Sequence, residues 1–229
     1  MMYPFFDGSM LLLIPALLLT MWAQFRVKST FERYSQVRAR GGITAAEVAR
    51  RLLDRFGLQS VAINHVGGNL TDHYDPRDRT LSLSDPVYGS SSIAAIGVAA
   101  HEVGHAIQHS VGYSPLAIRN SIVPVVNLTS SASIPLFFLG FLFQYPALMN
   151  IGIALFLGVI IFHVITLPVE LNASRRAIAI LSDTGVLASD ELSCAGKVLR
   201  AAAWTYIAAA LMAISQLFRL LMLRNSRNN

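Results

Sequence analysis

The stretch Ala99-Ala100-His101-Glu102-Val103-Gly104-His105-Ala106-Ile107-Gln108 carries the pattern His-Glu-x-x-His within a run that is typical of a helix. On a helix His101 and His105 lie on one face, about 6 Å apart along the axis, so both imidazoles can bind one metal ion. This spacing indicates a zinc site. Glu102 projects about 100° away from His101, beside the ion, where its carboxylate can accept a proton from water made acidic by the metal. We therefore predict His101 and His105 as zinc ligands and Glu102 as a general base.

A third histidine of the same run, His109, is excluded as a ligand. It lies about 12 Å beyond His101 along a helix axis, whereas zinc–nitrogen bonds are about 2 Å long. The metzincin pattern would place a Gly and a His where this chain has Gln108 and Val111. The third ligand must therefore come from elsewhere in the chain. A chance match on a surface helix is the alternative, but the uncharged residues 89–100 that precede the motif argue against it.

The composition is that of a membrane protein, since 54% of the 229 residues are hydrophobic and only 14% are charged. We predict a transmembrane anchor over residues 4–25 and a hairpin of two spans over the uncharged residues 120–168. A further helix over residues 201–223 either spans the membrane or lies in its interface. A cleaved signal peptide is the alternative for the first stretch, but Asp7 precedes its apolar run and no small-x-small site follows.

Residues 26–119 and 169–200 have the composition of soluble segments and are predicted to form the zinc domain. Thr44, with Glu47 three residues later, predicts a capping box that begins an amphipathic helix ending near Phe56.

Three short runs before the zinc motif predict a small antiparallel sheet. Residues 60–66 and 69–74 flank Gly67-Gly68 and favour a β-hairpin, and residues 80–84 alternate apolar and polar side chains. We expect this last strand at the sheet edge, where a peptide substrate can pair as an added strand.

Glu170 is the candidate for the third ligand, because a hairpin of two spans returns the chain to the side of the zinc helix. The alternative is an interfacial acid paired with Arg175 or Arg176. Fifteen of the 18 Lys and Arg residues lie in residues 26–119 and 170–200, so the positive-inside rule places the zinc side in the cytoplasm. Topology thus explains the net charge of +5, and we predict no nucleic-acid partner.

Several other side chains are candidates for supporting roles. His163 lies inside the second span of the hairpin, where an ionisable group is by default a functional suspect, although a satisfied buried histidine is the alternative. His73, Tyr74, Arg175 and Arg176 are alternatives for contacting the oxyanion of a tetrahedral intermediate.

Three stretches also carry a resemblance to a known family. They are Ser92-Ile93-Ala94-Ala95 through Gln108, Asp72-His73-Tyr74-Asp75-Pro76, and Leu167-Pro168-Val169-Glu170 with Ala173-Ser174-Arg175-Arg176. Together they resemble the bacterial membrane-anchored neutral zinc metallopeptidases of the YugP-like family, which is similar in its zinc site to the HtpX and CAAX prenyl protease group.

The resemblance implies an α-helical multi-pass membrane protein with a gluzincin-like α+β peptidase domain. It implies His101, His105 and Glu170 as the ligands of one zinc ion and Glu102 as the base. In the HtpX-like pattern an Asp follows Glu-x-x-Ala, whereas this chain has Ser174 at that position.

The sequence therefore predicts a zinc-dependent endopeptidase of the bacterial cytoplasmic membrane, which hydrolyses peptides or proteins on the cytoplasmic side. One alternative is an intramembrane site-2-type zinc protease, but its second Asp motif is missing from the spans, since Asp183-Thr184-Gly185 lies in a polar stretch. The other is a non-catalytic membrane scaffold stabilised by zinc. A structural site usually has four protein ligands, and the chain offers no obvious fourth. The sequence leaves the oligomeric state open.

Overall fold

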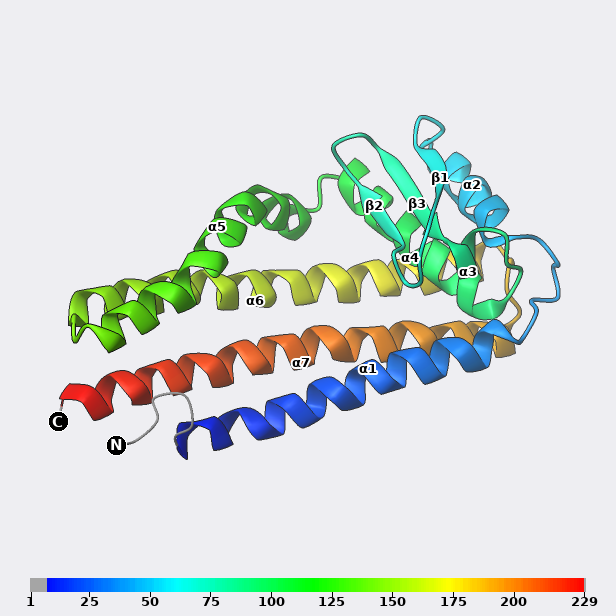
Figure 1. Ribbon diagram of the computed structural model, residues 1–229. Coiled ribbons are helices and arrows are strands. Elements are labelled where there is room, and N and C mark those ends of the chain that lie inside the picture. The colour runs from blue at the N-terminus through cyan, green and yellow to red at the C-terminus, as the bar shows by residue number, and fades with distance from the viewer. Residues whose placement is uncertain (1–7, 229) are drawn as a thin grey trace. The chain divides into compact units, whose positions relative to one another are not determined.

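The computed structural model describes the backbone of residues 8–228 and the side chains of residues 8–226. Figure 1 shows the order of the elements, which are predominantly helical. Their bounds are η1 (Gly8–Leu13), α1 (Ile14–Ser35), α2 (Ala45–Arg55), β1 (Ala62–Val66), β2 (His73–Asp75), β3 (Thr80–Ser84), α3 (Asp85–Tyr88), α4 (Ile93–Ser110), α5 (Ser114–Leu142), α6 (Pro146–Asp183) and α7 (Ser189–Asn228).

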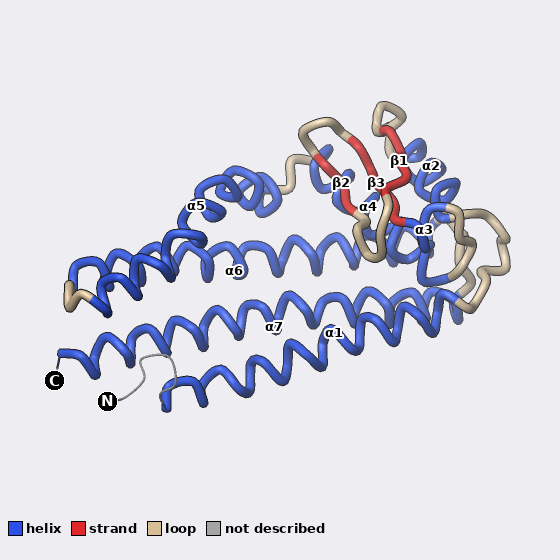
Figure 2. Tube along the Cα trace, in the orientation of Figure 1, coloured by secondary structure: helices blue, strands red, loops and turns tan. Residues whose placement is uncertain are grey.

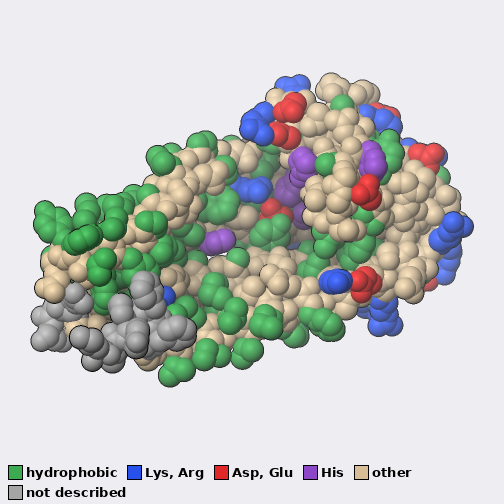
Figure 3. Space-filling model, in the orientation of Figure 1, with side chains coloured by type: hydrophobic (Ala, Val, Ile, Leu, Met, Phe, Trp, Pro, Cys, Tyr) green, Lys and Arg blue, Asp and Glu red, His purple; other side chains and the backbone are tan. Residues whose placement is uncertain are grey.

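The chain forms two compact units, each built from separate parts of the sequence. The first, which we call the α/β unit, comprises Phe25–Ala117 and Pro168–Ala203. The second, the helical unit, comprises the described residues before 25 together with residues 118–167 and 204–228. In the face drawn in Figure 3, charged side chains gather over the α/β unit. Hydrophobic side chains predominate over the helical unit.

Four helical segments of the described chain are long and apolar enough to cross a membrane. They are Gly8–Ser35, Ser114–Leu142, Pro146–Asp183 and Ser189–Ser226. This confirms the predicted helical multi-pass class. The fourth segment, for which the sequence left a span or an interfacial helix open, has the length and composition of a span. Residues 4–7 of the predicted first span lie outside the described residues.

Helix α5 packs closely on α6 within the helical unit. A Cβ added at Gly140 would lie 2.6 Å from the Met149 nitrogen, and one added at Gly152 would lie 2.7 Å from the Phe137 nitrogen. Glycines at these positions let the two backbones approach each other, as small residues commonly do between membrane helices.

The sheet of the α/β unit is mixed, so the predicted antiparallel sheet is wrong. Its strand order is β1-β3-β2 (Figure 2), and β1 is parallel and β2 antiparallel to β3. The predicted hairpin between the first two strands does not form, because β3 lies between them. The predicted edge position of residues 80–84 is also wrong, since β3 is central and β1 and β2 are the edges.

Burial and loop contacts explain this order. Leu81 and Leu83 are fully buried, so β3 gains most from the central position, where neighbouring strands flank it. The segment between β1 and β2 is bound to the end of β3 rather than folded into a tight turn. The Asp72 carboxylate accepts hydrogen bonds from the Ser84 backbone N–H and hydroxyl, each at 2.8 Å.

The core of the α/β unit is assembled around α4. The predicted capping box is confirmed, since the Thr44 side chain accepts from the Glu47 N–H and the Glu47 carboxylate accepts from the Thr44 N–H. The buried face of α2, which includes Val48 and Leu52, belongs to the same hydrophobic cluster as α4. Helix α4 is therefore the central buried helix of this unit.

Candidate metal centre

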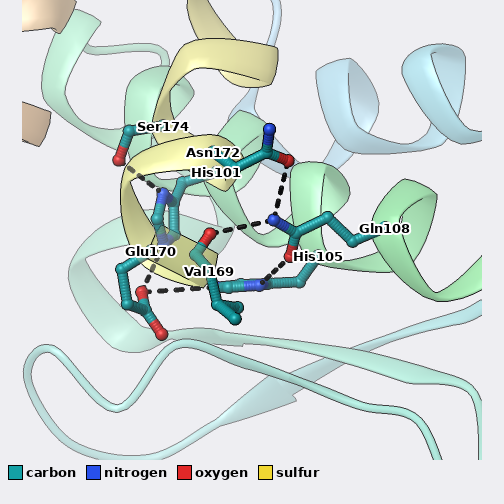
Figure 4. Close-up of polar contacts among 7 residues, drawn as sticks. All are labelled: His101, His105, Gln108, Val169, Glu170, Asn172 and Ser174. Carbon is teal, nitrogen blue, oxygen red and sulfur yellow. Dashed lines mark hydrogen bonds and ion pairs between the residues drawn. The ribbon is translucent and has the colours of Figure 1, made fainter. Parts of the chain in front are cut away.

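The two histidines of the motif lie one turn apart on α4 and direct their rings toward the same place. Ser92 caps the N-terminus of this helix by accepting a hydrogen bond from the Ala95 N–H. The ring centroids of His101 and His105 are 4.7 Å apart. Figure 4 shows both rings facing the Glu170 carboxylate, which comes from α6.

Gly104 permits this approach of α6 to α4. A Cβ at position 104 would lie 2.7 Å from the Ala173 carbonyl oxygen, closer than real Cβ contacts allow. Any larger residue would force the two helices apart. Sequence reasoning missed this role, although a glycine placed inside the His-Glu-x-x-His pattern was a visible signal.

The separations among the three side chains match the ligand geometry of a metal site. Glu170 Oε2 lies 3.3 Å from His101 Nε2 and 3.5 Å from His105 Nε2. Charge-assisted hydrogen bonds are shorter, about 2.7–2.9 Å. By contrast, two ligands on a tetrahedral zinc ion with bonds of about 2.0–2.1 Å are separated by roughly 3.3–3.4 Å. The donor set therefore fits zinc better than it fits a direct ion pair.

The far nitrogen of each imidazole is fixed by a polar partner. His105 Nδ1 lies 3.0 Å from Gln108 Oε1, and His101 Nδ1 lies 3.1 Å from the Ser174 hydroxyl. With Nδ1 occupied in this way, each ring leaves Nε2 directed toward Glu170 (Figure 4). Such partners orient metal-binding histidines and select the tautomer.

Gln108 is itself held so that only its oxygen can face His105. Its amide nitrogen donates to the Val169 carbonyl at 2.8 Å and to Asn172 Oδ1 at 2.9 Å. Asn172 also accepts from Arg176 Nε at 2.8 Å. Because the Gln108 amide N–H groups donate to these two acceptors, only the amide oxygen is left to face His105. His105 Nδ1 must therefore carry the proton, and Nε2 must offer its lone pair. These roles of Gln108 and Asn172 were not predicted, since they depend on contacts between α4 and α6.

Negative charge converges on the centre. Burial alone would lower the pKa of the His105 imidazole, but its contact with Glu170 and the charge of Glu102 raise that pKa above its ordinary value. The Glu102 side chain is buried, with 7% of its surface exposed. Two carboxylates beside two imidazoles thus favour a cation at this position.

The other residues that were candidates for supporting roles have partners outside the three proposed ligands. Tyr74 Oη lies 2.9 Å from His109 Nδ1, and burial raises the pKa of this tyrosine. His73 is exposed and its Nδ1 lies 2.8 Å from the Thr71 carbonyl oxygen. His163 belongs to the helical unit, where its ring packs against Phe162.

The two arginines that were candidates for contacting the oxyanion have different surroundings. Arg176 bonds to Asn172 beside the centre, whereas Arg175 lines an apolar groove between α6 and α7. Of the described His, Cys, Asp and Glu residues, only His101, His105 and Glu170 form a group with metal-ligand separations.

These features define a helical membrane protein with a centre of two histidines and one glutamate suited to zinc. The chain belongs to the family described as "Putative neutral zinc metallopeptidase", which matches residues 9–225. It is 50% identical over 212 residues to the "Putative membrane protease YugP" of Bacillus subtilis (strain 168), covering 93% of this chain and 94% of that protein. The resemblance inferred from the sequence motifs is thereby confirmed. No solved structure matches the chain.

Proposed function

We propose that this protein is a zinc-dependent endopeptidase that hydrolyses peptide bonds, with Glu102 as the general base. The observation that carries the proposal is the set of ligand separations, 3.3 Å and 3.5 Å from one Glu170 oxygen to the two Nε2 atoms. Membership of a zinc metallopeptidase family supports it independently.

The three side chains fit one zinc ion as a catalytic site rather than as a structural one. His101, His105 and Glu170 would hold the ion, and no fourth His, Cys, Asp or Glu of the described residues joins them. Catalytic zinc sites have three protein ligands and one open position, whereas structural sites usually have four protein ligands. Zinc supplies a Lewis acid that polarises a carbonyl and lowers the pKa of water. This arrangement favours an enzyme over a zinc-stabilised scaffold.

We assign the proton transfers of this reaction to Glu102. It directly follows a proposed ligand on α4, its side chain is buried, and its charge acts on His105. A carboxylate held there accepts a proton from the attacking water and delivers it to the leaving amine. The two ligands on the same helix fix its distance from the reacting atoms.

Tyr74 is our candidate for the hydrogen-bond donor to the oxyanion, ahead of His73, Arg175 and Arg176. It lines a pocket of about 300 Å³ together with Ala106 and His109, which follow the proposed ligand His105 along α4. The raised pKa keeps its hydroxyl protonated. If Tyr74 has this role, Tyr74→Phe lowers kcat by about 10²–10³-fold at constant zinc content. An unchanged kcat would exclude Tyr74 as the oxyanion donor.

The fold favours a peptidase domain outside the bilayer over a site-2-type intramembrane protease. Helix α4 is not among the four candidate spans of the described chain, and its buried residues form a core with α2 and the sheet. We place this domain at the cytoplasmic face of the bacterial inner membrane, on the distribution of Lys and Arg.

Cysteine labelling tests this sidedness. In a Cys194→Ser background, an impermeant maleimide added to intact spheroplasts should label Tyr145→Cys and leave Asp78→Cys unlabelled until lysis. The reverse pattern would place the peptidase domain outside the cell.

Metal analysis coupled to a cleavage profile tests the function itself. The purified protein in detergent should contain about one zinc per chain and cleave peptides from a mixed library. A chelator should abolish cleavage, and added zinc should restore it. A protein that retains zinc and cleaves none of the peptides would support the scaffold reading.

A further inference from the structure

A second feature of the α/β unit is an apolar groove between α6 and α7, with a volume of about 350 Å³. Leu171, Ile178, Leu199 and Ala203 provide its apolar surface, and Arg175 and Arg200 also line it. This volume falls within the range of small-ligand pockets, roughly 300–1,000 Å³. The groove is separate from the proposed metal ligands, although Ser174, which contacts His101, also lines it.

The two arginines of the groove have no anionic partner within the described part of the chain. Both are exposed, no acidic residue lines the groove, and neither forms an ion pair or hydrogen bond among the described residues. Elsewhere in the same unit an exposed arginine is paired, since Arg40 contacts Asp190 at 2.7 Å. Two unpaired guanidinium groups beside apolar surface are complementary to an anion with an apolar tail.

Gly196 lets one of these guanidinium groups lie over the groove. A Cβ at position 196 would lie 3.2 Å from Arg200 Nη1 and 3.8 Å from Ile178 Cδ1. The Arg200 side chain therefore folds back along α7 over residue 196, which also faces Ile178 of α6. Its guanidinium group is positioned by the absence of a side chain at residue 196.

Both arginines also stand where the apolar part of their helix ends. Residues 146–169 of α6 carry no charge, and Arg175 is the first cationic residue after them. Residues 201–218 of α7 are likewise uncharged, and Arg200 is the last cationic residue before them. Cationic side chains at the ends of apolar helical runs lie at the level of lipid headgroups. Basic pockets between such helices are a recognised form of lipid site.

We propose that this groove binds an anionic phospholipid, a role distinct from peptide hydrolysis. Its phosphate lies between Arg175 and Arg200, where guanidinium groups form paired hydrogen bonds with phosphate oxygens. One acyl chain packs along Leu171, Leu199 and Ala203. A zwitterionic lipid carries its own cation, which competes for the same phosphate, so the groove selects lipids of net negative charge.

Native mass spectrometry of the full-length protein tests the proposal. The protein is purified in a neutral detergent and titrated with dioleoyl phosphatidylglycerol or, separately, dioleoyl phosphatidylcholine. The wild type should retain one phosphatidylglycerol at concentrations where phosphatidylcholine is lost. Arg175→Gln and Arg200→Gln should each weaken retention about fivefold, and the double variant by more than about tenfold. Equal retention of both lipids, or wild-type retention by the double variant, would overturn the proposal.

Matched variants distinguish binding of the lipid headgroup from binding of the acyl chain. Lys197→Gln removes an exposed cation from the same helix outside the groove and should leave retention unchanged. Ala203→Phe fills the apolar surface without changing charge and should abolish retention. Full displacement of the lipid by equimolar glycerol phosphate would show that the phosphate alone is bound and would refute the acyl-chain part. Zinc content and peptide cleavage are both measured on every sample. Lost zinc identifies a misfolded variant, and absent cleavage by the zinc-loaded wild type identifies a failed peptidase assignment, each independently of lipid retention.

Discussion

Two faces of α6 differ in how their polar groups are satisfied. One face packs against α4 and carries Glu170 and Ala173, and its polar contacts include Gln108 bonded to both Val169 and Asn172. The neighbouring face lines the groove with α7 and exposes Arg175 beside apolar side chains, with no bonded partner among the described residues. On the first face, the polar groups around the three proposed ligand atoms bond to one another. On the second face, the arginine has no anionic partner among the described residues.

The two kinds of polar surface suit different tasks. Groups held by several hydrogen bonds have fixed positions, as a metal centre and its base require. Cationic groups without partners are available to a ligand, because no internal bond must be broken first. Variants at the metal centre, variants at the contact between α4 and α6, and the groove variants described above test this contrast.

The largest effect is expected at Glu102. Glu102→Gln keeps the size of the side chain and removes its basicity, so cleavage should fall by about 10²–10⁴-fold. Zinc content should stay at the wild-type level, because the three ligands are intact. Peptide hydrolysis and metal analysis of the same sample check both points. Retained hydrolysis would show that another group takes the proton.

Glu170→Ala should affect metal binding most strongly. It removes the oxygen that lies closest to both Nε2 atoms, so zinc affinity should fall by more than the roughly 100-fold that changes to supporting residues cost. Competition with a zinc chelator measures the affinity. Asp183→Ala, an exposed acid at the end of the same helix, is the control and should bind zinc normally. Full occupancy after the loss of Glu170 would assign the third ligand to another residue.

Changes to the partners of the imidazoles should have intermediate effects. Ser174→Ala leaves His101 Nδ1 without its neighbour and should lower zinc affinity by about tenfold, within the 10–100-fold range for such partners. Ser174→Asp restores an acceptor at the position where the HtpX-like pattern has one, and should recover the affinity. If both variants bind zinc as the wild type does, His101 is oriented by packing alone.

Gln108→Glu separates the two functions of Gln108. The carboxylate can still accept from His105 Nδ1 but cannot donate to the Val169 carbonyl. We expect zinc binding to persist while the thermal midpoint in detergent falls, because a buried carbonyl loses its partner at a cost of about 1–3 kcal/mol. An unchanged midpoint would mean that water replaces the lost donor.

The smallest effect on chemistry, but a clear one on stability, is expected at the contact between the helices. Gly104→Ala places a Cβ 2.7 Å from the Ala173 carbonyl, so the backbones must shift and stability should fall by about 1–3 kcal/mol. Gly97→Ala is the matched control, because its Cβ would meet Ala195 at an ordinary 3.4 Å. There the higher helix propensity of alanine should leave stability equal or higher. Similar thermal midpoints for the two variants would contradict a close approach at Gly104.

Features that depend on local sequence were predictable. Helical periodicity places His101 and His105 on one face of α4, and the Thr44–Glu47 capping box begins α2 as predicted. Hydropathy likewise identifies four candidate spans, because transfer into a membrane depends on the composition of each segment. Glu170 was a candidate because the uncharged hairpin returns the chain to the side of the motif, a topological argument that uses only segment lengths.

Features that depend on contacts distant in sequence were decided by the tertiary structure. The strand order could not be predicted, because the central position of β3 results from the burial of Leu81 and Leu83 and from the bond of Asp72 to Ser84. The roles of Gln108 and Ser174 arise only where α4 and α6 meet at Gly104. The sequence by itself therefore determined the helices and the chemical types of the proposed ligands, since these follow from local periodicity. Packing alone determined which side chains surround them, because that requires the three-dimensional approach of two helices joined by a long connection.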